Sequence, residues 1–220
     1  MVEVKVGLKT IDLPYTIRVY GVTEEMFDEL IDEDTKAELI DGVMIVHSPA
    51  SLRHEDIASF LGGLMSFYAD ARALGKVIGS GNGVVHLAIC RKFAPDIFFI
   101  PRERVPPSLP IEFEGAPDLV VEVLSPSNRH EDLNQKRQAY RDAGVGEVWF
   151  VDYENRKAIV DRKQYTGYAE EVVAEGRVSS KVLGGFWVNA SWLWAEPLPN
   201  RMSCLQEILT SPLLPSQQSS

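Results

Sequence analysis

One short segment constrains the fold more than any other: the run from Leu119 to Leu124, LVVEVL, which is apolar and rich in β-branched residues. Such a run is typical of a buried β-strand. Glu122 lies in its middle, and a buried carboxylate without a partner is very costly. Because side chains alternate along a strand, Glu122 shares one face with Val120 and Leu124. If a helix covers that face, the carboxylate needs a cation.

The segment after this strand predicts a helix that can supply the cation. Residues 128–143 carry a helix-start pattern, and Gly144 is a typical helix stop. At about 100° per residue, Lys136 falls in the middle of the apolar stripe, between Leu133 and Tyr140. A lysine in such a place can also bury only its stem and extend its ammonium to solvent. Because the helix follows the strand closely, we expect Lys136 to be the partner of the strand carboxylate.

A second acid stands in a similar setting. Asp96 follows Pro95 at the mouth of the apolar strand IFFI. Two acids carried by strands could meet around a divalent metal, since Mg²⁺ takes one or two carboxylates and keeps several waters. The alternative is that both acids bind loop amides or pair with arginines.

The order of elements indicates an α/β protein, with an α+β mixed sheet flanked by helices. Asp41-Gly42 between two apolar runs predicts a β-hairpin. A long helix is expected after Ser48-Pro49, with Gly75 as its end. We expect a single domain over residues 1–196 and a C-terminal tail, partly disordered, over 197–220.

Composition narrows the class of protein. The chain has 220 residues and a net charge of −10, which argues against non-specific coating of nucleic acid. Its N-terminus is too polar for a secretory signal, and it contains no run of about 18 apolar residues. Cys90 and Cys204 lie far apart without metal-like spacing. We therefore expect a cytoplasmic protein with reduced thiols.

At this point the residues resemble the PD-(D/E)XK nuclease superfamily, since Pro95-Asp96 and Glu122 fit its motif. More narrowly, the chain is similar to a family described as restriction endonuclease-like. The similarity spans about residues 23–190 and rests on the following stretches: AELIDGVMIVHSPASLRHEDI, APDIFFIPRERV, EGAPDLVVEVLSPSNRHEDLNQKRQAYRDAGVGEVWFVD and LGGFW.

The resemblance implies a restriction endonuclease-like core and a divalent metal, Mg²⁺ or Mn²⁺, on Asp96 and Glu122. The backbone carbonyl of Val123 would be a further ligand. The superfamily places its catalytic lysine two residues after the glutamate, where this chain has Leu124, so Lys136 would substitute from the helix. Glu38, before the Asp41-Gly42 turn, matches the upstream acid of the family and would reach the metal through water.

The implied function is that of a Mg²⁺-dependent endodeoxyribonuclease with DNA as its partner. The metal would polarise a phosphodiester oxygen and activate a water, and Lys136 would orient that water and stabilise the transition state. Because a single-site domain usually cuts both strands as a pair, a homodimer is expected.

Further residues keep two interpretations. Arg53 and His54 could contact a substrate phosphate, together with Tyr140 from the helix expected over residues 128–143, or they could be structural. Four basic residues could form a local rim for nucleic acid or could be ion-pair partners: Arg91, Lys92, Arg129 and Arg137.

Two rival functions also stay open. One is a catalytically degenerate module of the same fold that binds a protein or nucleic-acid partner, which the acidic charge and Leu124 favour. The other is hydrolysis of another phosphoester or a glycoside, since paired carboxylates serve there too. Glycoside chemistry does not need a lysine, which distinguishes the two kinds of hydrolase.

Overall fold

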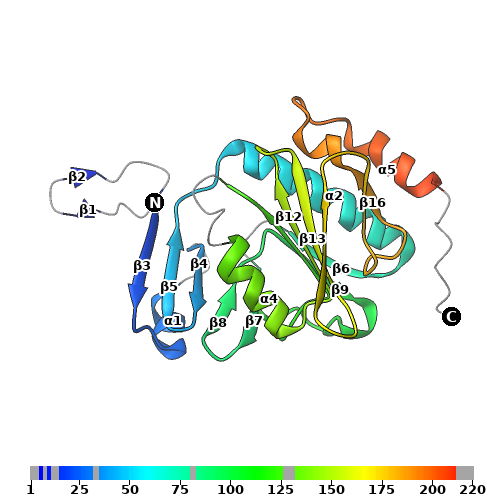
Figure 1. Ribbon diagram of the computed structural model, residues 1–220. Helices are drawn as coiled ribbons and strands as arrows, with labels where there is room; N and C mark the ends of the chain where they lie inside the picture. Colours follow the sequence, from blue (N-terminus) through cyan, green and yellow to red (C-terminus); the bar gives the residue numbers. More distant parts are fainter. Residues whose placement is uncertain are drawn as a thin grey trace.

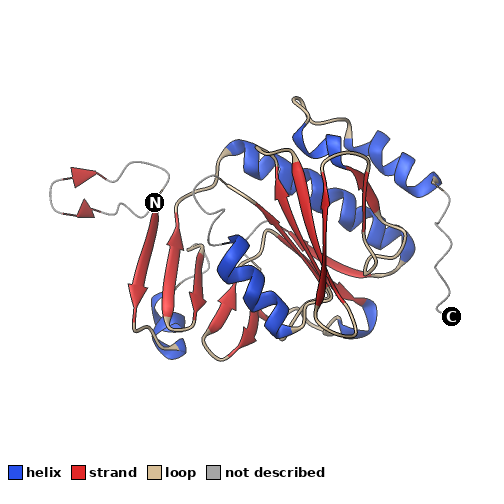
Figure 2. Cartoon of the chain, in the orientation of Figure 1, coloured by secondary structure: helices blue, strands red, loops and turns tan. Residues whose placement is uncertain are grey.

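The computed structural model describes residues 5–6, 9–10, 15–31, 35–79, 83–125 and 132–211. Two six-stranded β-sheets form its body, and helices lie against them (Figure 1, Figure 2). The α-helices of the described part are α1 (Glu24–Leu30), α2 (Leu52–Arg72), α4 (Arg137–Ala143) and α5 (Arg201–Thr210). None of them is long and apolar enough to cross a bilayer. The expected class, mixed sheets with flanking helices, is confirmed.

The first sheet holds the strand that carries Glu122. Its strands, in spatial order, are β14 (Tyr168–Val173), β13 (Lys157–Lys163), β12 (Glu147–Asp152), β11 (Leu119–Val123), β9 (Ile97–Pro101) and β6 (Gly75–Gly79). Strands β11 and β12 run parallel, and every other neighbouring pair is antiparallel. A parallel pair needs a crossover connection, and α4 lies in the connection between these two strands.

The second sheet is built around the hairpin predicted at Asp41-Gly42. Its strands, in spatial order, are β10 (Glu112–Glu114), β7 (Val84–Ala88), β8 (Arg91–Phe93), β4 (Ala37–Ile40), β5 (Val43–His47) and β3 (Thr16–Tyr20). Asp41 and Gly42 both have positive φ, 49° and 83°, which a tight two-residue hairpin turn requires. The register that follows pairs Ile40 with Val43 and Glu38 with Ile45.

Shorter elements complete the described chain. They are β1 (Lys5–Val6), β2 (Lys9–Thr10), β15 (Arg177–Ser179), β16 (Trp187–Asn189), the 3₁₀ turns η1 (Arg102–Arg104) and η3 (Ala190–Trp194), and the π-helical turn η2 (Asp132–Lys136), which leads directly into α4.

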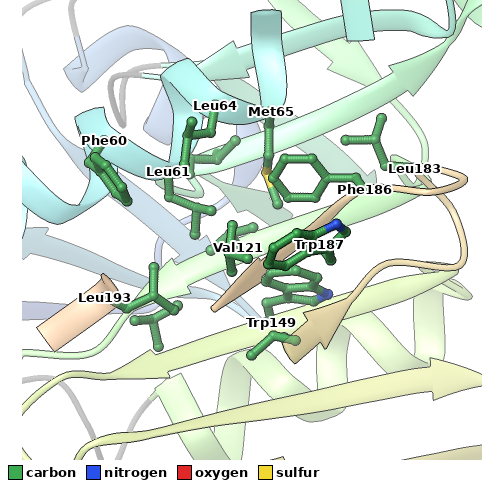
Figure 3. Packing of buried hydrophobic residues seen from close by; sticks show 14 of the residues in the cluster. Phe60, Leu61, Leu64, Met65, Val121, Trp149, Leu183, Phe186, Trp187 and Leu193 are labelled. Atoms are coloured by element: carbon green, nitrogen blue, oxygen red, sulfur yellow. The ribbon is translucent and has the colours of Figure 1, made fainter. Parts of the chain in front are cut away.

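The two faces of β11 pack into different cores, as the alternation of its side chains predicts. Leu119, Val121 and Val123 belong to a cluster formed with α2, α5 and the segment around β16. Figure 3 shows residues of this cluster gathered around Val121. Val120 and Leu124 belong to a second cluster that includes residues of α4 and of the second sheet. Glu122 therefore points into the layer between the two sheets.

The long helix begins later and ends earlier than expected. Ser51, rather than the Ser48-Pro49 pair, caps α2, and Ala73 ends it in the left-handed conformation. Gly75, expected as the helix stop, is the first residue of β6. It has φ of 152°, and an added Cβ would lie 2.1 Å from the Ile100 carbonyl oxygen. Close approach to β9 therefore explains the glycine.

The expected C-terminal tail begins with ordered structure. Helix α5 packs against α2, and Cys204, Leu205 and Ile208 are buried in the same cluster as Val121 (Figure 1). Residues 212–220 lie outside the described residues.

Candidate active site

Glu122 is held by the helix that covers its face. Its side chain is only 4% exposed, and its Oε1 accepts hydrogen bonds from Tyr140 Oη at 2.6 Å and Lys136 Nζ at 3.4 Å. Both donors come from the η2–α4 segment, one helical turn apart. The expected pairing of Lys136 with Glu122 is confirmed, and Tyr140 is a second partner that the helical spacing places on the same face.

Lys136 is closer to a different acid. Its Nζ lies 2.8 Å from Oε1 of Glu38, in addition to the contact with Glu122. Lys136 ends the π-helical turn η2, and such turns often occur at functional sites. The ammonium therefore joins β4 of one sheet to β11 of the other, and its buried side chain does not extend to solvent.

Glu38 is the most enclosed acid of the group. It is fully buried, and it accepts from His47 Nε2 at 2.9 Å and from the Ala94 amide at 3.2 Å. Burial acts to raise the pKa of Glu38, but the charge of Lys136 and the bond and charge of His47 outweigh it, so the pKa falls to about 2. Glu38 is thus a carboxylate anion throughout the neutral range.

Asp96 stands at the start of β9 with three donors. Its Oδ2 accepts from the Val123 amide at 2.8 Å and lies 3.1 Å from His54 Nε2, and its Oδ1 accepts from Lys36 Nζ at 3.1 Å. Burial acts to raise the pKa of Asp96, but the Lys36 charge, the His54 contact and the Val123 amide together lower it well below its usual value.

The donor set fits a hard divalent ion in its chemistry. Glu38, Asp96 and Glu122 are buried carboxylates, and carboxylate oxygens are the ligands that Mg²⁺ and Mn²⁺ prefer. Among the described residues, three possible metal ligands have atoms that all lie within 4.8 Å of one another in another place, at His86, Glu112 and Glu114. Each of the three carboxylates instead pairs with a lysine ammonium. An ion bound here would therefore have to replace a lysine that now neutralises a carboxylate.

Leu124, where the resemblance leads us to expect a lysine, is fully buried in the cluster with Val120 and Tyr140. A lysine there would bury its ammonium among apolar side chains. The helix delivers the ammonium of Lys136 to the glutamate from the side instead.

Of the other expected contacts, His54 joins the cluster and Arg53 does not. Arg53 donates to the Ala195 carbonyl at 2.8 Å and pairs with Glu196, so it ties α2 to the segment before α5. His54 lies on the next residue of α2 and points to Asp96.

The basic residues expected at a rim are engaged in ion pairs. Arg91 pairs with Asp41 and Asp142, Lys92 with Asp28 and Glu112, and Arg137 with Asp161 and Glu170. Arg129 lies outside the described residues. This arrangement favours the interpretation as ion-pair partners over that of a basic rim that binds nucleic acid.

Sequence reasoning missed Lys36 and His47. The hairpin register set by the Asp41-Gly42 turn could have indicated both residues. Extended by one pair, that register places Lys36 opposite His47, whose backbone amide donates to the Lys36 carbonyl. Alternation then places Lys36 and Glu38 on one face of the hairpin. Which acid Lys36 reaches depends on the other sheet, and the turn register does not contain that information.

The fold and these residues define the chain as a protein of the restriction endonuclease-like class. The family Uma2, described as "Putative restriction endonuclease", matches residues 24–191, and the chain belongs to it. A solved structure with the same fold is that of "a putative nuclease belonging to DUF820 from Anabaena variabilis ATCC 29413". It has a TM-score of 0.69 and 18% sequence identity, and the match covers 79% of this chain and 97% of that one. None of the curated proteins compared with the chain matches it.

Proposed function

We propose that the protein is a metal-dependent endonuclease that hydrolyses DNA phosphodiester bonds with Mg²⁺ or Mn²⁺. The observation that carries this proposal is the position of Lys136, whose ammonium contacts both Glu38 and Glu122, while Asp96 directly precedes β9, the strand paired with β11. Glu38 and Asp96 lie far in the sequence from the strand and helix that supply Glu122 and Lys136. Family membership and the fold of the Anabaena variabilis protein support the nuclease class.

Asp96 and Glu122 would hold the ion, with the carbonyl of Val123 as a further ligand. When bound, the ion supplies Lewis-acid polarisation of the phosphodiester. The ammonium of Lys136 can orient a water by hydrogen bonding and stabilise negative charge on the reacting phosphate. Glu38 fixes Lys136 at 2.8 Å and is itself fixed by His47, so its role is to position the ammonium.

A degenerate binding module is the second candidate, favoured by one observation. Each acid of the cluster is already paired with a lysine, which is also what a site that has lost its metal would show. A glycoside hydrolase is disfavoured, because its chemistry would leave the buried Lys136 without a use. The homodimer and the cytoplasmic location stay predictions.

Cleavage of supercoiled plasmid tests the proposal. We expect nicking with Mg²⁺ or Mn²⁺ and none in EDTA, and a loss of at least 100-fold in rate for Asp96→Asn, Glu122→Gln and Lys136→Met. Glu175→Gln and Lys181→Met, which make the same charge changes at exposed positions, should cut at the wild-type rate. Circular dichroism checks that each variant folds. A folded Lys136→Met that cuts like wild type, or a wild type inert with both metals, would overturn the proposal.

A further inference from the structure

Lys36 is a cation that the proposed chemistry does not use. It precedes β4 by one residue, and its Nζ lies 3.1 Å from Asp96 Oδ1. Asp96 is one of the two carboxylates proposed to bind the metal, so the ammonium is bonded to an oxygen atom that an ion would need. The contact joins residues 60 positions apart, each of which directly precedes a strand of a different sheet.

The charges of the cluster depend on this lysine. With His47 and His54 taken as neutral, Glu38, Asp96 and Glu122 carry three negative charges, and Lys36 and Lys136 carry two positive ones. Burial acts to lower the pKa of Lys36, but the charges of Asp96, Glu122 and Glu38 raise it above its usual value against the repulsion of Lys136. All three acids therefore act on the Lys36 ammonium. If a divalent ion replaced that ammonium, the cluster would become neutral.

The two lysines differ in their access to solvent. The side chain of Lys136 is 6% exposed and contacts two acids, whereas that of Lys36 is 29% exposed and has Asp96 as the acid it bonds. Lysine has a long, flexible stem that can extend its ammonium into water. When an ion takes its place at Asp96, Lys36 can therefore move its ammonium into water, whereas the buried Lys136 cannot leave its acids without burying an unpaired charge.

We propose that Lys36 is a displaceable counter-ion of the metal site: its ammonium neutralises Asp96 in the metal-free protein, and a divalent ion binds there by displacing it. This inference rests on the proposed function, because it assumes the same metal site. The Lys36 ammonium and the metal ion therefore compete for Asp96. Lys36 stabilises the metal-free protein and lowers the affinity for metal, and a metal-loaded protein has Lys36 in solvent at the mouth of the site.

The affinity for Mn²⁺ tests this competition, measured by calorimetric titration of the full-length protein at pH 7.5. We expect Lys36→Met and Lys36→Gln to bind Mn²⁺ at least tenfold more tightly than wild type. Lys36→Arg, which keeps the charge, should stay within about threefold of wild type, and so should Lys181→Met, the matched change at an exposed lysine. In EDTA, Lys36→Met should melt below wild type, because Asp96 loses its ammonium.

Two neutral variants are used so that a folding failure of one leaves the other to decide. Equal Mn²⁺ affinity in wild type and the folded neutral variants would overturn the role of Lys36 and leave the metal site intact. Absence of binding in all of them would overturn both the inference and the proposed function. Binding by the neutral variants alone would support the inference and show that Lys36 closes the site. Tight binding that survives Asp96→Asn in the Lys36→Met background would place the ion elsewhere and overturn the inference.

Discussion

At the scale of single residues, Glu38 is a buried acid whose ionisation stabilises the fold. Its pKa of about 2 lies below the ordinary value of 4.5, so its charge stabilises the fold above pH 4.5, and that contribution is lost as pH falls from 4.5 towards 2. Glu38→Gln leaves Lys136 beside a neutral amide in a buried site. We expect a loss of about 3 kcal/mol at pH 7, a typical figure for breaking a buried ion pair.

Urea unfolding at pH 7 and at pH 3 measures this effect. The gap between wild type and Glu38→Gln should narrow at pH 3, because wild type then loses part of the stability that Glu38 contributes. Glu175→Gln, at an exposed position, is the control and should stay within about 0.5 kcal/mol of wild type at both pH values. A gap for Glu38→Gln that is as large at pH 3 as at pH 7 would mean that its charge is not what stabilises the fold.

At the scale of elements, α5 is part of the core on which the site is built. Leu205 and Ile208 are buried against α2, and the N-terminal half of α2 carries His54. Burial of such a side chain contributes about 1.5–3 kcal/mol, so truncation after Pro199 should cost several kcal/mol of folding stability. Thermal melting checks this against truncation after Ser211, which retains all of α5. If both truncated proteins melted at the same temperature, α5 would be dispensable for the fold.

At the scale of the whole molecule, the net charge of −10 limits how DNA can be held. Arg91, Lys92 and Arg137, three of the basic residues expected at a rim, are already engaged with acids, so these three are not available to phosphates. Non-specific binding depends on such contacts, and each adds about 0.9 to the slope of log affinity against log salt. We expect a dissociation constant no tighter than about 10 µM at physiological salt, and a loss of only about tenfold between 50 and 200 mM salt, as for one or two contacts.

Fluorescence anisotropy with a labelled duplex and Ca²⁺ in place of Mg²⁺ measures both quantities. Binding at nanomolar concentration with a steep salt dependence would contradict this expectation. It would mean that the acidic partners release these basic residues when DNA arrives.

The sequence alone determined those parts of the site that arise from local periodicity. Alternation along Leu119–Val123 places Glu122 on the face that α4 covers, and helical spacing places Lys136 and Tyr140 on the inward stripe. The turn at Asp41-Gly42 fixes its own hairpin, because both residues tolerate positive φ. Such features depend on neighbours a few residues away, so a single sequence contains them.

Only the tertiary structure decided which charges meet. Lys136 lies closer to Glu38 than to Glu122, and Asp96 takes Lys36 and His54 as partners, because two sheets pack on either side of this layer. No periodicity records a contact between residues 60 or 98 positions apart, the separations of Lys36 from Asp96 and of Glu38 from Lys136. A buried charge accepts whichever partner the packing of other elements brings to it, and that packing is a property of the whole fold.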